Sequence, residues 1–241
     1  MSKNSIISIV IPAFNEEKYI ENTLFSLLKS EQKTHINYEV ILVDNNSTDE
    51  TVNIAQKFKE GMNLRIIKES KQGRGVARAR GFNEARGDII LSADADTIFY
   101  RGWIETLTNA LKGTVVGVTT SCRINDSLPL TNTVFNFSQP ILMVLYRIFS
   151  GHYWLSGFSF GILRFVYEKA GGFNVSLQAQ EDIDLSFRVA KLGKIKFVNK
   201  PVTFSGRRFR NGIVYGLYEY TQTFLNVFLF KRKNVYLSNP R

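Results

Sequence analysis

Two aspartates stand two residues apart directly after an apolar run in the first half of the chain. The run is Ile89–Ala93, and the aspartates are Asp94 and Asp96. Such a run predicts a buried strand, and open α/β sheets bind their ligands at the carboxyl ends of strands. Carboxylate oxygens at that place suit Mg²⁺ or Mn²⁺ bridged to phosphate. The motif indicates a metal-held nucleotide, although a lone motif of this length is more often a solvated acidic turn.

The pattern along the chain predicts the elements that hold these aspartates. Apolar runs at 6–11, 38–43, 64–67 and 89–93 alternate with helical patterns that begin near residues 16, 49, 75 and 103. Strands and helices interleaved in this way are typical of a mostly parallel sheet built from βαβ units. We therefore predict a Rossmann-like α/β half over residues 1–120. Residues 121–210, rich in glycine, proline and aromatic side chains, are expected to form a mixed α+β half that binds a second ligand.

Composition and charge limit the class of protein and its partners. With 241 residues and 44% hydrophobic content, the chain can bury a full core. Its single cysteine, Cys122, excludes an internal disulfide, and the start of the chain lacks a signal-peptide pattern, so we expect a cytoplasmic location. The net charge of +10 favours an anionic partner such as a nucleotide or an acidic membrane surface. Nucleic acid is not expected, because no module that reads it is recognisable.

Five short motifs, taken in sequence order, resemble those of family 2 glycosyltransferases. They lie at residues 9–17, 43–51, 73–78, 94–96 and 181–182. The resemblance spans residues 6 to 210. It implies a GT-A fold, a nucleotide-sugar donor, Mg²⁺ or Mn²⁺ as cofactor, and inversion at the anomeric carbon. Residues 207–210 resemble only loosely the Q-x-x-R-W motif of the family's processive polymerases, so we expect transfer of one sugar per acceptor.

The resemblance also implies a donor site. Glu16 would hold either a ribose hydroxyl or a nearby basic side chain, and Asp44 would read the base, which favours uracil or guanine. Arg74 lies in a glycine-rich loop at a helix start, where backbone N–H groups favour phosphate. The implied donor-binding residues are Pro12, Ala13, Asn15, Glu16, Asp44, Asn46, Gly73, Arg74, Arg78, Asp94, Arg207 and Arg208.

The same resemblance assigns the metal and the catalytic base. Asp96 matches the position that contacts the cation, and Asp94 the position that touches ribose or a cation-bound water. Asp182 would take the proton of an acceptor hydroxyl, with Glu181 orienting the acceptor. The alternative is that both carboxylates only stabilise a helix start. If the acceptor were a lipid phosphate, no base would be needed and Asp182 would position it.

The acceptor side carries fewer signals. Trp154, Ser156 and Gly157 match the acceptor pocket, where an aromatic face can stack on a sugar, and Phe158 is expected in the core. Residues 211–241 are aromatic and basic, which fits either a helix on an anionic membrane or a terminal helix packed on the domain. The acceptor is accordingly expected to be a glycan or a polyprenyl-linked molecule. The competing hypotheses are a nucleotidyltransferase, which would need a glycine-rich basic stretch after the first strand, and a non-catalytic nucleotide-sugar binder.

Overall fold

The first four strands form where the sequence predicts them. The computed structural model describes residues 6–30, 36–177 and 179–209, with isolated positions 212, 214, 218 and 222. Neighbouring strands in the order β3-β2-β1-β4 are parallel. Their bounds are β1 (Ile7–Ala13), β2 (Tyr38–Asp44), β3 (Leu64–Lys68) and β4 (Ile89–Ala93). The α/β prediction for this half is confirmed.

Helices cover both faces of this sheet because side chains alternate along each strand. Ile9 and Ile11 pack in one core cluster with Leu24 of α1 (Ile20–Ser30). Val10 points the other way and packs in a second cluster with Phe82 of α3 (Arg74–Glu84). A short helix α2 (Thr51–Gln56) follows β2, close to where the helical pattern near residue 49 predicts a helix to begin.

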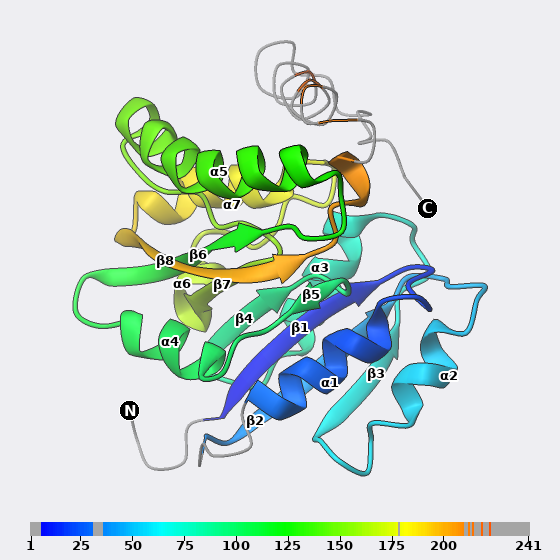
Figure 1. The fold of residues 1–241 in the computed structure, drawn as a ribbon. Coiled ribbons are helices and arrows are strands. Elements are labelled where there is room, and N and C mark those ends of the chain that lie inside the picture. Colours follow the sequence, from blue (N-terminus) through cyan, green and yellow to red (C-terminus); the bar gives the residue numbers. More distant parts are fainter. Residues whose placement is uncertain are drawn as a thin grey trace.

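The second half continues the same sheet and adds antiparallel strands (Figure 1). Beyond β4 the order is β7-β6-β8-β5, with β7 antiparallel to both β4 and β6 and with β6 parallel to β8. The predicted boundary at residue 120 falls inside β6. The elements that follow β4 in the chain are β5 (Thr97–Ile98), α4 (Trp103–Ala110), β6 (Val115–Arg123), α5 (Pro129–Ser150), β7 (Ser159–Leu163), α6 (Arg164–Lys169), α7 (Glu181–Ala190), β8 (Lys194–Phe204) and the 3₁₀ helix η1 (Arg207–Phe209).

The longest of the described helices is α5, which lies along one side of the sheet near β6 and β8 (Figure 1). It begins with a proline at its first turn and ends at Gly151, whose φ of +78° is in the left-handed region. Among the helices in the described ranges, none is long and apolar enough to cross a bilayer. The C-terminal segment predicted at 211–241 lies outside the described residues, apart from the four isolated positions.

Candidate functional site

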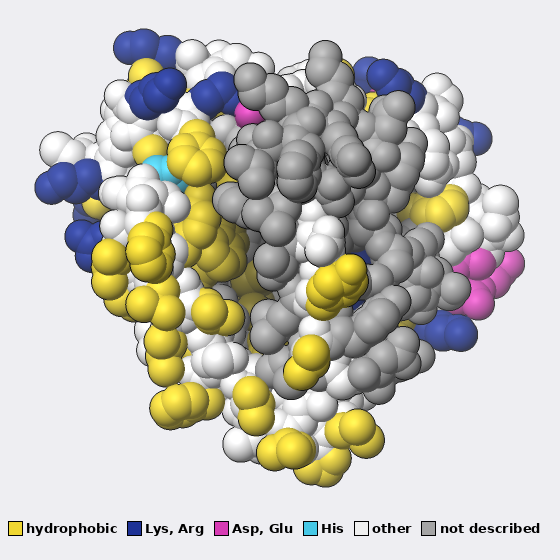
Figure 2. Space-filling model, turned by 90° about the horizontal axis from the view of Figure 1, so that it is seen from above, with side chains coloured by type: hydrophobic (Ala, Val, Ile, Leu, Met, Phe, Trp, Pro, Cys, Tyr) yellow, Lys and Arg dark blue, Asp and Glu magenta, His cyan; other side chains and the backbone are white. Residues whose placement is uncertain are grey.

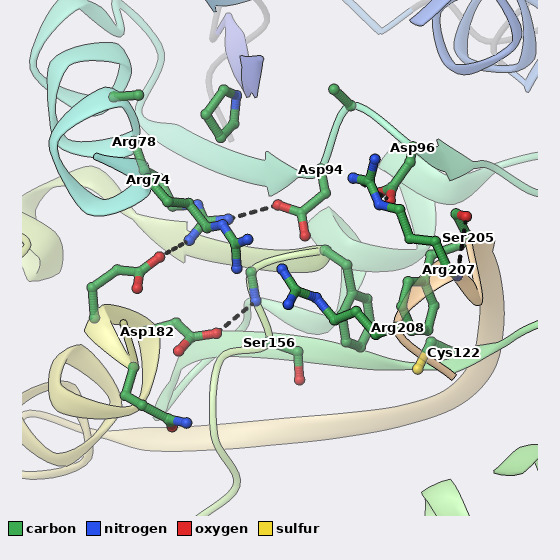
Figure 3. Close-up of a pocket in the computed structure, with 18 of the residues that line it drawn as sticks. Arg74, Arg78, Asp94, Asp96, Cys122, Ser156, Asp182, Ser205, Arg207 and Arg208 are labelled. Carbon is green, nitrogen blue, oxygen red and sulfur yellow. Dashed lines mark hydrogen bonds and ion pairs between the residues drawn. The ribbon is translucent and has the colours of Figure 1, made fainter. Parts of the chain in front are cut away.

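A cavity of about 790 Å³ lies where the two halves of the sheet meet. Its walls come from the ends of β1 and β4, the start of α3, one face of α5, the loop before β7, the start of α7 and η1. Side chains far apart in the sequence point into this space in Figure 3. The cavity therefore joins the predicted donor half to the predicted acceptor half.

A buried arginine connects the two halves at the centre of the cavity wall. Arg78 of α3 is 1% exposed, and its Nη2 donates to Asp94 Oδ1 at 2.7 Å. Its Nη1 donates to Glu181 Oε1 at the start of α7 (Figure 3). A β-carbon at Gly157 would lie 2.6 Å from Arg78 Nη2, so a larger residue there would force the guanidinium to shift. The resemblance places Arg78 among the donor-binding residues, but its guanidinium is already engaged by two carboxylates.

A second arginine holds the other aspartate of the motif. Arg207 forms two hydrogen bonds with Glu16, at 2.9 and 2.8 Å, and its Nη2 lies 3.0 Å from Asp96 Oδ2. Of the two partners proposed for Glu16 from sequence, a ribose hydroxyl or a basic side chain, the structure shows the basic one. These contacts join η1 to the loops that follow β1 and β4. One wall of the donor side is thus formed by Arg207, which lies more than a hundred positions after Glu16 and Asp96 in the sequence.

The two aspartates have opposite electrostatic environments. Burial raises the pKa of Asp96 to about 7, and the nearby carboxylates of Asp94 and Glu16 add to the rise while Arg207 opposes it. Burial acts in the same direction on Asp94, but the charges of Arg78, Arg74 and Arg207 outweigh it and hold the Asp94 pKa below its ordinary value. The surroundings therefore favour the ionised form of Asp94 but disfavour that of Asp96.

The carboxylate oxygens of Asp94 and Asp96 fit a hard divalent cation that also coordinates a bound ligand. Within the described ranges, no three His, Cys, Asp or Glu side chains come together as a complete metal cage. Asp94 and Asp96 supply only carboxylate oxygens. The positive charge of a cation beside Asp96 would stabilise the ionised carboxylate and so offset the desolvation that raises its pKa. Mg²⁺ and Mn²⁺ keep open positions for phosphate oxygens and water in sites of this kind.

The predicted base lies on the opposite wall from the aspartate motif. Asp182 lines the cavity, and its Oδ2 accepts a hydrogen bond from the Gly157 N–H at 3.0 Å. Its Oδ1 accepts from the Ile183 N–H at 2.9 Å. Burial raises the Asp182 pKa to about 6, helped by the charge of Glu181 and opposed by Arg78 and the two backbone N–H groups. Asp182 is therefore ionised near neutral pH but titrates close to it.

Besides Arg78, three basic side chains line the cavity, and they come from two elements. Arg74 comes from the first residue of α3, and Arg207 and Arg208 come from η1 (Figure 3). The loop before α3 is tied by Asn45, whose Oδ1 accepts from the Gly73 N–H at 2.8 Å. Gly73 has a φ of +148°, which is costly for other residues. The loop thus presents Arg74 and the amino end of α3 to the cavity, as an anion site requires.

The remaining predicted site residues divide into two groups. Pro12, Ala13, Trp154 and Ser156 line the cavity, together with Gly157. Three others do not line it, and their side chains instead connect loops. Asn15 Oδ1 accepts from the Thr48 N–H, Asp44 Oδ1 accepts from the Ser47 N–H, and Asn46 Nδ2 donates to the Ser70 carbonyl. Their roles in donor binding stay predictions.

Several cavity residues escape prediction from sequence. Phe158 packs, partly buried, against the first core cluster, as the sequence predicts, and it also lines the cavity, which the sequence does not indicate. One face of α5 contributes four more side chains. Their spacing of three to four residues is the helical signal that could have found them. They are Phe135, Gln139, Leu142 and Tyr146.

Comparison with known sequences places the chain among sugar-transferring proteins. The model of the family described as glycosyl transferase family 2 matches residues 8–170. The poly(ribitol-phosphate) β-N-acetylglucosaminyltransferase TarS of Staphylococcus aureus is 35% identical over 106 residues, which are 43% of this chain and 18% of TarS. The chain thus corresponds to a small part of that relative's length.

Solved structures share the fold. The mannosyltransferase PcManGT from Pyrobaculum calidifontis, in complex with GDP-Man and Mn²⁺, superposes with a TM-score of 0.64 at 18% identity, covering 92% of this chain and 65% of that one. Glucosyl-3-phosphoglycerate synthase from Mycobacterium tuberculosis, in complex with Mn²⁺, UDP and glucosyl-3-phosphoglycerate, gives 0.64 at 20% identity and covers 96% and 81%. The GT-A type of fold expected from the sequence is confirmed. Because the family model matches more than half of its residues, the chain belongs to glycosyl transferase family 2.

Proposed function

We propose that the protein is an inverting, metal-dependent glycosyltransferase that moves one sugar from a UDP- or GDP-sugar to a glycan or lipid-linked acceptor. One observation carries this proposal. A single cavity has the aspartate motif and basic side chains on one wall and Asp182 on the other, with Arg78 bonded to both sides. A sugar between the two walls would have its diphosphate at one end and its acceptor at the other.

The donor end is built for a diphosphate. Asp96, with Asp94 beside it, would hold Mg²⁺ or Mn²⁺, which supplies Lewis-acid stabilisation of the charge on the departing diphosphate. Arg74 and Arg208 reach the same space, and guanidinium groups pair well with phosphate oxygens. In the structure Arg207 occupies the place beside Asp96. Arg207 would pair with phosphate once it leaves Asp96.

The acceptor end is built to remove a proton. Each Asp182 oxygen accepts one backbone N–H, which leaves further lone pairs for an acceptor hydroxyl. As the acceptor oxygen bonds to the anomeric carbon, its proton passes to Asp182. The bond between that carbon and the diphosphate breaks, and the electron pair leaves with the phosphate oxygen. A carboxylate with a pKa of about 6 is ionised at neutral pH and basic enough to accept the proton.

The acceptor subsite has an aromatic and a hydroxyl contribution. Trp154 lines the cavity, where its ring can cover a sugar face. Ser156 Oγ is buried and, among the described residues, has no hydrogen-bond partner. A buried hydroxyl without a partner is costly, so an acceptor hydroxyl would satisfy it. These two residues extend the reaction site away from the donor.

The direct test is a screen of UDP-, GDP- and dTDP-sugars for release of the free nucleoside diphosphate. With Mn²⁺ present, we expect turnover of a UDP- or GDP-sugar, and we expect EDTA to abolish it. A matched pair of variants separates catalysis from folding: Asp182→Asn should retain donor binding and lose transfer, whereas Asp184→Asn on the same helix should retain both. Equal turnover in EDTA would reject the metal, and full activity of Asp182→Asn would reject the base.

A further inference from the structure

The helix α5 exposes an apolar face along its whole length. Nine large apolar side chains between residues 130 and 149 are at least 40% exposed. The most exposed are Leu130 (75%), Phe137 (76%), Ile148 (69%) and Phe149 (86%). Residues 130, 134, 137, 141, 144 and 148 follow the helical repeat, so they form one continuous stripe. A contiguous stripe of this length marks an interaction surface rather than ordinary surface variation.

The helix is held firmly from its other side. Asn136 both donates to the Ile124 carbonyl and accepts from the Ile124 N–H, at 3.0 and 2.8 Å. Asn132 makes the same pair of contacts with Ser127, at 3.1 and 3.2 Å. Four buried residues of α5, Thr131, Phe135, Gln139 and Met143, form the inner face. The exposed stripe is therefore presented by a fixed helix and is not the by-product of a loose end.

Charge selects the kind of partner. Residues 129–150 contain no acidic residue and one basic residue, Arg147, while the whole chain has a net charge of +10. Two copies of so basic a chain repel each other, whereas an anionic bilayer attracts it. A helix with an exposed apolar face can lie in the plane of the bilayer interface, with that face buried at the headgroup boundary. Since α5 is not apolar enough to span a membrane, its stripe fits the surface of one.

The stripe runs beside the mouth of the cavity. Leu142 is 41% exposed and also lines the cavity, and Tyr146 lines it one turn further on. In Figure 2 hydrophobic side chains form a band along one side of the molecule and continue into a hollow beside it. A bilayer against this band would meet the cavity that contains Asp182.

From these observations we propose that the exposed apolar face of α5 docks the protein on the surface of an anionic lipid bilayer, with the helix lying in the interface plane. The proposal concerns the described helix α5, not the C-terminal segment for which the sequence suggests a membrane contact. It is also independent of the donor, because docking needs no nucleotide sugar.

The test is flotation of the full chain with vesicles of phosphatidylcholine and phosphatidylglycerol. We expect the wild type to float, and the combined variant Phe137→Ser, Ile148→Ser, Phe149→Ser to bind about 100-fold more weakly, since three apolar side chains leave the lipid. Matched control variants replace exposed aromatic residues on other helices, Phe25→Ser on α1 and Phe165→Ser on α6. They should float like the wild type.

A second measurement avoids substitutions that could disturb folding. Phe137→Trp keeps an apolar side chain, and its emission should shift to shorter wavelength and be quenched by brominated lipid, whereas Phe165→Trp should show neither effect. The proposal is overturned if the wild type does not float or if the triple variant floats equally well. It is also overturned if only Lys231→Glu, Arg232→Glu, Lys233→Glu abolishes flotation, or if sedimentation shows a wild-type dimer that the triple variant dissociates while neither floats.

Discussion

Replacing Asp182 by asparagine should make the folded protein more stable at alkaline pH while removing transfer. Burial and the charge of Glu181 raise the Asp182 pKa from 3.8 to about 6. A carboxylate whose pKa is raised on folding stabilises the fold only while it is protonated. Its contribution is complete below 3.8 and is lost as the pH rises through about 6. The ionised Asp182 side chain therefore lowers the unfolding free energy of the protein.

The magnitude follows from the size of the shift. Two pKa units correspond to about 3 kcal/mol of unfolding free energy at pH 8. Asparagine has one acceptor oxygen where the carboxylate has two, so it loses one of the hydrogen bonds from Gly157 and Ile183, which costs about 1 kcal/mol. We therefore expect Asp182→Asn to be about 2 kcal/mol more stable than the wild type at pH 8 and of about equal stability at pH 4.

Urea unfolding followed by circular dichroism across pH 4 to 8 measures this difference. The matched control is Asp184→Asn on the same helix, which removes an ion pair with Arg188 at 2.6 Å and should lower stability by about 0.5 kcal/mol. The reasoning is refuted if Asp182→Asn is less stable than the wild type at pH 8. It is equally refuted if the difference between the two proteins does not grow with pH.

Two further changes test the buried arginine and the metal. Arg78→Met should lower the unfolding free energy, measured in urea, by about 3–5 kcal/mol, because Asp94 and Glu181 lose their shared cation. The control Arg80→Met, at an exposed arginine, should lower it by less than about 0.5 kcal/mol. Similar losses in the two variants would show that the contacts of Arg78 with Asp94 and Glu181 are unimportant for stability. Asp96→Asn should abolish the Mn²⁺-dependent rise in melting temperature with a nucleoside diphosphate. In the wild type the apparent Mn²⁺ affinity should fall below about pH 7, where protons compete for Asp96; calorimetric affinity that is flat with pH would contradict this.

The donor half could be predicted closely because its signals are local. The apolar runs that become β1 and β4 are uninterrupted, and the aspartate motif follows β4 directly. A strand that is buried on both faces appears in the sequence as a continuous apolar run, so it can be predicted without reference to the rest of the chain. The same locality explains why Gly73 and Arg74 fall at a helix start, as expected.

The pairing of the charged groups could not be predicted, because it depends on contacts distant in sequence. Arg78 and Glu181 are 103 residues apart, and Arg207 and Glu16 are 191 apart. The sequence shows four charged side chains suited to a ligand, but not that they hold one another. The face of α5 was obscured for a different reason. Pro140 and polar residues interrupt the run of apolar residues, so the sequence alone does not indicate which side chains of this helix line a cavity.

The most direct test of the account is anomalous diffraction from crystals soaked with Mn²⁺ and UDP or GDP. The account predicts a manganese peak within coordination distance of Asp96 and next to the diphosphate, with Arg74 and Arg208 on the phosphate oxygens and Asp182 facing the vacant sugar position. A nucleotide bound with its diphosphate away from the aspartate motif, or a manganese ion held elsewhere in the cavity, would contradict it.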